Sequence, residues 1–301
     1  MTISTMDCPH CKSPETELFS KNKYSQKRLY CKACRKWSVK LGAPKILLFD
    51  IETSQTIFKA WRTGKQYLGW KQIKEPSFII SWAAKWLFDP DSLGGSVTRQ
   101  EAIGRDDARV VKSIYKLLNR ADFVITHNGD KFDIKKLNWK FLLYDLVPNN
   151  RYKSLDTLKK CKAVFGCDSY AMDYLAQSLG YDGKHETGIE LWDGVEAGDK
   201  KSIAKMLAYN INDVYMLEDL YLRTRGWMKT HPNFAIFADM YQDLQPGEYV
   251  CPRCLQSIYR TKFTRVWTTP AGYKYKSCNC PHCGAVLRRT KRKPGQRMKL
   301  K

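Results

Sequence analysis

The sequence predicts an α/β protein with a central mixed β-sheet flanked by helices and a small cysteine-rich module at each end. Three observations predict this architecture. The chain has 301 residues, which is more than a typical single domain. Short apolar segments typical of strands alternate with helix-type periodicity between residues 45 and 228. Eight of the eleven cysteines form four C-x-x-C pairs, two before this segment and two after it.

The cysteine pairs predict two structural zinc sites, one in each terminal module. A C-x-x-C turn presents two sulfur atoms, and a hairpin of roughly twenty residues brings a second turn opposite it, which completes a tetrahedral shell of four thiolates. In an intracellular chain such pairs indicate metal binding and not disulfides. The expected zinc ligands are Cys8, Cys11, Cys31 and Cys34 in the N-terminal ribbon and Cys251, Cys254, Cys280 and Cys283 in the C-terminal ribbon.

One ligand of the C-terminal site has an alternative. Cys278 precedes Cys280 by two residues and is able to replace it. His10 and His282 lie inside two of the turns, and we expect them to be exposed turn residues and not ligands.

The first acidic feature of the central segment follows a buried strand. After Pro44, four apolar residues lead into Asp50-Ile-Glu52. Residues two apart on a strand share a face, so the two carboxylates converge. A buried Asp is costly unless it is paired or bound to metal, and a divalent cation is the usual remedy for converging carboxylates.

Two further acids follow at helical positions. Asp133 falls in the first turn of an amphipathic helix that begins after a strand and the turn Asn128-Gly129. Asp213 lies on or beside the apolar face of a later helix, and Tyr209 precedes it by one turn on the same side. An acid that faces the core requires a counter-charge.

Together these segments resemble the DEDD superfamily of 3′–5′ exonucleases, which have a ribonuclease H-like fold. Asp50-Ile-Glu52 looks like its first motif, Asn128-x-x-x-Phe132-Asp133 its second, and Tyr209-x-x-x-Asp213 its third, in the tyrosine (DEDDy) variant. The histidine variant would need His at Ala208. The segment from Asp168 to Gly180, followed by Lys184, looks like the helix that precedes the last motif in the proofreading domains of family B DNA polymerases. The resemblance covers about residues 45–225.

The resemblance implies a two-metal phosphodiester hydrolysis that releases nucleoside 5′-monophosphates. Asp50, Glu52, Asp133 and Asp213 would hold two Mg²⁺ or Mn²⁺ ions about 4 Å apart. Asp50 would bridge both ions, and Glu52 and Asp213 would complete the one on the nucleophile side. Asp133 would lie near the other ion, partly through water, and Tyr209 would hold the attacking water in line.

The expected organisation has five parts. Residues 1–44 form a zinc ribbon, 45–228 the ribonuclease H-like domain, 229–245 a linker, 246–287 a second zinc ribbon and 288–301 a basic tail. Within the central domain the expected order is β-β-β-α-β-α, followed by three more helices. The expected helices are Asp106–Asn119, a helix after Asp133, and segments at about 155–165, 170–180 and 199–222.

The charge predicts a polyanionic partner. The formal charge is +22, and most of the excess lies in the flanks. Residues 1–44 hold nine Lys/Arg against three Asp/Glu, and residues 246–301 hold fourteen against one. Neutralised phosphates release counterions, so such segments favour nucleic acid, and we expect DNA in preference to RNA. A replication or repair protein is the expected protein partner.

The sequence predicts neither a membrane span nor a membrane partner. No run of eighteen or more uncharged apolar residues occurs, and the N-terminus lacks the basic and apolar regions of a signal peptide. The expected location is cytoplasmic, beside the nucleoid, or in the host cytoplasm if the protein is viral.

Two other functions remain alternatives to the exonuclease. One is a nucleic-acid-binding zinc-ribbon protein with a degenerate nuclease scaffold, and the other is a structure-specific endonuclease of the same fold. The tryptophans Trp61, Trp70, Trp82 and Trp86 lie on expected hairpin strands and are interpreted as core, with stacking of one of them on a base as the alternative.

Overall fold

A computed structural model describes most of the chain. The described residues are 13, 15–19, 28–35, 37–38, 44–148, 152–181, 188–234, 248–259, 265–268 and 272–288. The chain divides into a central unit, Lys45–Thr224, and a second grouping that contains Met1–Pro44 and Arg225–Lys301. The central unit thus ends four residues before the boundary expected from the sequence. The expected tail beyond Arg288 and most of the expected linker lie outside the described residues.

The central unit is built on a five-stranded mixed sheet with the order β10-β9-β4-β7-β8. β4 pairs antiparallel with β7 and parallel with β9, so it lies at the centre of the sheet. The strands are β4 (Ile46–Thr53), β7 (Ile79–Trp86), β8 (Ser92–Ser96), β9 (Phe123–Thr126) and β10 (Lys153–Asp156).

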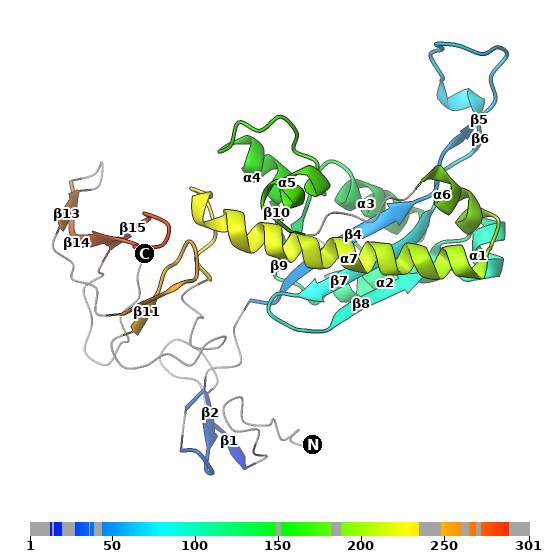
Figure 1. Cartoon of the computed structure of the whole chain (residues 1–301). Coiled ribbons are helices and arrows are strands. Elements are labelled where there is room, and N and C mark those ends of the chain that lie inside the picture. Colours follow the sequence, from blue (N-terminus) through cyan, green and yellow to red (C-terminus); the bar gives the residue numbers. More distant parts are fainter. Residues whose placement is uncertain are drawn as a thin grey trace. The chain divides into compact units, whose positions relative to one another are not determined.

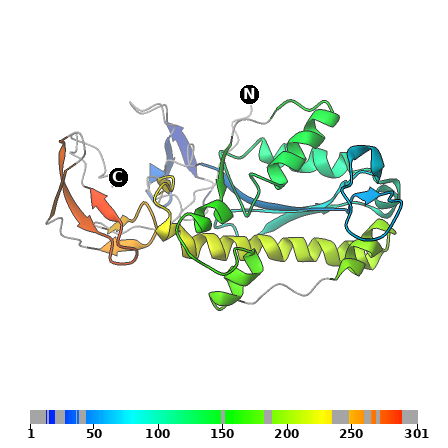
Figure 2. The same cartoon turned by 90° about the horizontal axis from the view of Figure 1, so that it is seen from above.

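Helices cover both faces of this sheet, as Figure 2 shows. The long helix α7 (Lys200–Thr224) packs on β4, β7 and β8, whereas α2 (Ala108–Leu118) and α3 (Asp133–Leu143) cover the other face. The shorter helices are α1 (Arg99–Gly104), α4 (Thr157–Lys162), α5 (Met172–Ser178) and α6 (Ile189–Glu196).

The central strand is apolar on both faces because both are covered. Leu47, Leu48 and Phe49 are fully buried, and the apolar run that the sequence places there is typical of a strand between two helical layers. The run ends at Asp50, where polar side chains begin. The predicted α/β fold with a mixed sheet flanked by helices is therefore confirmed.

A hairpin interrupts the connection from β4 to β7. Its strands are β5 (Ile57–Phe58) and β6 (Ile73–Glu75), with a 3-10 turn η1 (Trp70–Gln72) before β6. The hairpin projects from the rest of the central unit (Figure 1). The interpretation of its two tryptophans as core is wrong, because Trp61 is 99% exposed and Trp70 is 78% exposed.

The other two tryptophans agree better with a core position. Trp82 is buried, and Trp86 packs against the core as a partly buried side chain. Both belong to β7 inside the sheet, whereas the hairpin strands contain only two or three residues and have no second layer to pack on.

The terminal segments form small antiparallel sheets. The N-terminal sheet contains β1 (Thr16–Phe19), β2 (Arg28–Cys31) and β3 (Trp37–Ser38). The C-terminal segment starts with a 3-10 turn η2 (Arg225–Trp227). It then forms β11 (Glu248–Val250) with β12 (Ser257–Tyr259), and β13 (Arg265–Thr268) with β14 (Lys274–Asn279) and β15 (Val286–Arg288). Within the described parts of the chain, no helix is long and apolar enough to cross a membrane.

Candidate active site

Three carboxylates converge at the centre of the sheet. Asp50 and Glu52 project from the same face of β4, and Asp213 reaches them from α7, so that one oxygen of each lies within 4.8 Å of the others. Asp50 and Glu52 are partly exposed, whereas Asp213 is buried. Hard oxygen ligands at this spacing are the donor set that Mg²⁺ and Mn²⁺ prefer.

A buried amide on α7 orients the first of these acids. Asn210 Nδ2 donates to Asp50 Oδ2 at 2.6 Å, and Asn210 Oδ1 accepts from the Ser81 hydroxyl at 3.3 Å. Asn210 is fully buried and precedes Asp213 by one turn. The sequence places Asn210 on the apolar face of this helix, but its role was missed. A polar residue on a buried helical face was the available signal.

We expect Asn210→Ala to weaken metal binding because Asp50 loses the donor that fixes its carboxylate. Partners that orient a metal ligand contribute 10- to 100-fold in affinity, so a change of about that size is expected in the Kd for Mn²⁺. Electron paramagnetic resonance titration of Mn²⁺ measures it. Asn212→Ala on the same helix is the control, and equal Kd values for the two variants would contradict the role of Asn210.

Asp133 lies next to this cluster but outside the group of three. Its Oδ1 accepts the backbone N–H of Ile51 at 3.1 Å, between Asp50 and Glu52. This N–H is accessible because the parallel pairing of β4 with β9 stops at Leu48 and Ile125. The region beyond the carboxyl ends of the strands is where ligands commonly bind in α/β sheets.

Burial changes the protonation of this fourth acid. Loss of solvent raises the pKa of Asp133 to about 7, and the negative charge of Asp156 acts in the same direction. Hydrogen bonds from backbone N–H groups only partly oppose this rise. A nearby cation favours the charged form of a carboxyl, so bound metal would lower the pKa of Asp133 again.

Asp156 fixes the turn that leads to Asp133. It is buried at the end of β10, and its oxygens accept the N–H of Asn128 at 3.0 Å and of Asp130 at 3.3 Å. Asn128 has a left-handed backbone with φ of 68°, which Asn tolerates better than most residues. Gly129 lies so close to Thr126 that a Cβ atom would meet its hydroxyl at 2.3 Å. The Asn-Gly sequence is thus required by the local backbone.

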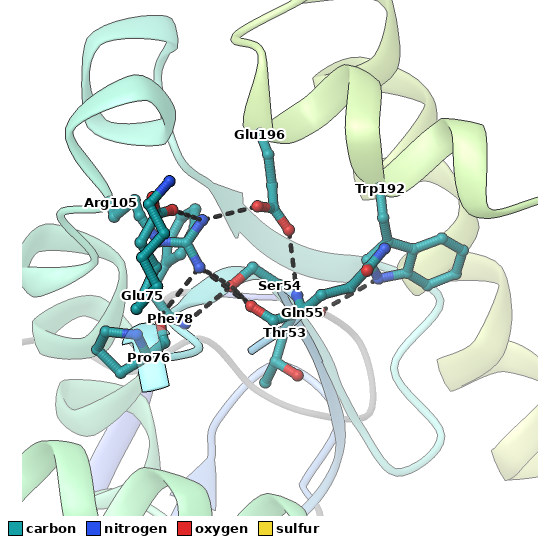
Figure 3. A network of polar contacts seen from close by, with 10 residues as sticks. Thr53, Ser54, Gln55, Glu75, Pro76, Phe78, Arg105, Trp192 and Glu196 are labelled. Carbon is teal, nitrogen blue, oxygen red and sulfur yellow. Dashed lines mark hydrogen bonds and ion pairs between the residues drawn. The ribbon is translucent and has the colours of Figure 1, made fainter. Parts of the chain in front are cut away.

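Tyr209 precedes Asp213 by one turn of α7 and makes an aromatic contact with Trp192. Its ring meets that of Trp192 edge-on, with centroids 6.4 Å apart, and Trp192 Nε1 donates to the carbonyl of Thr53 at 3.2 Å. Figure 3 shows Trp192 beside Thr53 at the end of β4. Trp192 therefore links the tyrosine of α7 to the residue that follows Glu52. Helix α6, which carries Trp192, was not predicted from the sequence.

A second metal-type cluster lies in the C-terminal segment. Cys251, Cys254, Cys280 and Cys283 place their sulfur atoms within 4.8 Å of one another. The hydrogen bond between Cys251 and Cys254 lowers the pKa of Cys251 and raises the pKa of Cys254, so the two thiols share one proton. The thiolate is the form that binds zinc. Four sulfurs in one group fit a closed tetrahedral site, whereas Cys278 is buried in the neighbouring core outside the group.

The cysteine turns share one backbone conformation. The residue after the second cysteine is left-handed in the three described turns, namely Arg35, Leu255 and Gly284. Cys34 N–H also points to the sulfur of Cys31 at 3.5 Å. The N-terminal turn thus has the geometry of the two C-terminal ones. Cys8 and Cys11, the other two expected ligands, lie outside the described residues.

A model of a known protein family matches most of the central unit. Residues 95–224 match a family model described as RNase_H superfamily. No curated protein matches the chain at a significant level. Among solved structures, the chain is similar to the family B DNA polymerase from the hyperthermophilic archaeon Pyrobaculum calidifontis, with 15% sequence identity and a TM-score of 0.44. This similarity covers 64% of the present chain and 26% of the polymerase.

The family match over residues 95–224 agrees with the ribonuclease H-like fold that the sequence motifs predicted for the central domain. The matched segment contains Asp133, Tyr209 and Asp213, whereas Asp50 and Glu52 precede it and are added to the site by the sheet. The family match supports a nuclease-type function with a nucleic acid as substrate.

Proposed function

We propose that the protein is a metal-dependent 3′–5′ exonuclease that hydrolyses phosphodiester bonds and releases nucleoside 5′-monophosphates. The convergence of Asp50, Glu52 and Asp213 at the carboxyl end of the central strand is the observation that carries this proposal. Three carboxylates that converge to this spacing repel one another when they are charged. Bound cations would compensate that repulsion.

The acids divide into two groups by position. Asp50, Glu52 and Asp213 would hold one divalent cation together, while Asp133, on the side of β4 that faces β9, would contribute to a second. Such ions activate a water molecule and neutralise the charge that develops on the phosphate. Asn210 keeps the Asp50 carboxylate in its orientation, and Asp156 holds the turn before Asp133.

Tyr209 is proposed to orient the attacking water through its hydroxyl group. Its ring is fixed by Trp192, and it precedes Asp213 by one turn of α7. Since a phenol hydroxyl hydrogen-bonds to water without being consumed, the residue acts by positioning and not as a nucleophile. The placement of Tyr209 one turn before Asp213 is the feature that favours an exonuclease over an endonuclease of the same fold.

Tyr209→Phe should reduce kcat by ~10-fold to ~1,000-fold, because only the orientation of the water is lost. Single-turnover cleavage of an end-labelled oligonucleotide measures the effect. Tyr215→Phe is a matched control, because this tyrosine lies on the same helix and its hydroxyl bonds to the carbonyl of Pro90 at 3.0 Å. If Tyr209→Phe is as inactive as a variant that lacks Asp50, the residue has a different role.

The general test of the proposal is digestion of defined nucleic acids. We expect cleavage with Mg²⁺ or Mn²⁺ and none after chelation with EDTA. Labelled single-stranded DNA, double-stranded DNA and RNA are compared at equal concentration, and DNA is the expected preferred substrate. Absence of cleavage for all three substrates with either metal would overturn the nuclease proposal.

A further inference from the structure

The hairpin between β4 and β7 carries an unusual set of exposed aromatic side chains. Trp61 is 99% exposed, Tyr67 is 95% exposed and Trp70 is 78% exposed. All three lie within ten residues at the projecting end of the hairpin (Figure 1). Exposed apolar groups that are clustered in this way commonly mark an interaction site.

The same hairpin carries an excess of positive charge. Residues 54–77 contain five Lys/Arg and one acid, Glu75, at the end of β6. The basic residues are Lys59, Arg62, Lys65, Lys71 and Lys74. Aromatic rings combined with an excess of cations are suited to single-stranded nucleic acid, whose bases stack on the rings while its phosphates meet the cations. An apolar protein partner gains nothing from this charge.

Arg105 fixes both legs of the hairpin at its base. Its Nη2 donates to the Ser54 hydroxyl at 3.1 Å and to the carbonyl of Gln55 at 3.0 Å, which belong to the first leg. The same nitrogen donates to the carbonyl of Pro76 at 3.0 Å, which belongs to the second leg. One guanidinium therefore joins the points where the chain leaves β4 and returns towards β7 (Figure 3).

Two acids hold that guanidinium in place. Glu196 of α6 pairs with Arg105 at 2.7 Å and also accepts the N–H of Gln55 at 3.1 Å. Glu75 pairs with the same nitrogen, Nη1, at 3.3 Å. The Arg105 side chain is largely buried, so these charged contacts are screened less than surface pairs. The base of the hairpin is thus rigid while its end projects.

The rigid base adjoins the acidic cluster. Only Thr53 separates Glu52 from Ser54, and the Thr53 carbonyl accepts the hydrogen bond from Trp192, whose ring contacts Tyr209. A β-bulge between Glu52 and Thr53 redirects the chain at this point. A strand that runs from the end of the hairpin to its base would therefore lead to the carboxylates.

We propose that residues 54–77 form a single-stranded nucleic-acid-binding element that stacks substrate bases on Trp61, Tyr67 and Trp70 and whose base adjoins the acidic cluster. This inference rests on the proposed nuclease function for its substrate. It assigns the hairpin a function that the carboxylates alone do not provide, because they contact the scissile phosphate but not the bases.

The test uses the full-length chain and two triple variants. One replaces the aromatic residues, W61A/Y67A/W70A, and the other replaces three cations, K59A/R62A/K65A. W139A is the matched control, because Trp139 is 57% exposed on α3, away from the hairpin in sequence. Fluorescence anisotropy with a labelled single-stranded oligonucleotide, in Ca²⁺ in place of Mg²⁺, gives Kd at several salt concentrations.

We expect the aromatic variant to weaken binding by at least ~10-fold, because each stacked base contributes roughly 5-fold or more and three rings are removed. The cation variant should reduce the slope of log K against log salt by about 0.7 for each phosphate contact that is lost. Unchanged Kd and unchanged slope in both variants, relative to wild type and W139A, would overturn the proposal. Binding to phosphatidylserine vesicles is measured in parallel. A variant that loses vesicle binding but keeps its affinity for the oligonucleotide would also overturn the proposal.

A second readout separates this proposal from the nuclease proposal. Cleavage of the p-nitrophenyl ester of thymidine 5′-monophosphate reports on the acidic site with a substrate too short to span the hairpin. The loss in kcat/KM of the aromatic variant should be at least ~10-fold greater for a long oligonucleotide than for this ester. An equal loss for both substrates would contradict a binding role. If the wild-type protein cleaves neither substrate but the variants bind the oligonucleotide more weakly, the nuclease proposal is overturned and the binding role of the hairpin is supported.

Discussion

Asp50→Asn should lower nuclease activity by roughly 1,000-fold or more, which corresponds to ~4 kcal/mol of transition-state stabilisation. Asp50 is the acid that joins the cluster with Glu52 and Asp213 and accepts the hydrogen bond of Asn210. Asparagine has nearly the same shape but lacks the charge that the cations require. Initial rates on an end-labelled oligonucleotide, together with calorimetric titration of Mg²⁺, measure the loss.

The fold should survive this substitution. Removal of one of three converging charges relieves repulsion, so the Tm in EDTA should be equal to or above that of wild type. Asp219→Asn is the control, because Asp219 lies on the same helix as Asp213 but is exposed. If Asp50→Asn retains near wild-type activity, the assignment of the acidic cluster as the active site is wrong.

Cys280→Ser should remove one zinc ion per chain and unfold the C-terminal ribbon. Its sulfur lies within the group of four, and structural zinc contributes about 10–16 kcal/mol to small domains of this kind. Cys278→Ser should keep the zinc, because Cys278 is buried in the adjacent core and lies outside the group. Elemental analysis of metal-replete protein gives the zinc content of each variant.

The zinc contents of the two variants show whether Cys280 or Cys278 is the fourth ligand. Retention of zinc by Cys280→Ser with its loss from Cys278→Ser would reverse the assignment of the ligand. No zinc in the wild-type protein would overturn both ribbon sites. A content of two zinc ions per wild-type chain is expected when the N-terminal pairs are included.

The acidic cluster was accessible to sequence reasoning because each acid follows a simple periodicity. Alternation along a strand places Asp50 and Glu52 on one face, and the helical period places Asp213 on the side that packs on the sheet. The carboxyl end of an apolar run predicts where the polar site begins. The two periodicities apply here because β4 is regular as far as Glu52 and α7 is regular as far as Asp213.

Other parts of the site depend on contacts between distant residues. Asn210 meets Asp50 across 160 positions, and Asp133 meets Ile51 across 82, so no local pattern indicates either contact. Trp61 and Trp70 were predicted to be core because tryptophan is usually buried, yet a hairpin without a second layer leaves them exposed. Arg105 has no motif around it, and its role becomes clear only when both legs of the hairpin are seen to meet there.

The direction and end requirement of cleavage test the central claim most directly. Linear single-stranded DNA labelled at its 5′ end is compared with circular single-stranded DNA, both with Mg²⁺, and the released products are separated by chromatography. The account predicts a ladder that shortens from the 3′ end, nucleoside 5′-monophosphates as the products, and intact circles. Cleavage of the circles, or loss of the 5′ label before the 3′ end is shortened, would contradict a 3′–5′ exonuclease.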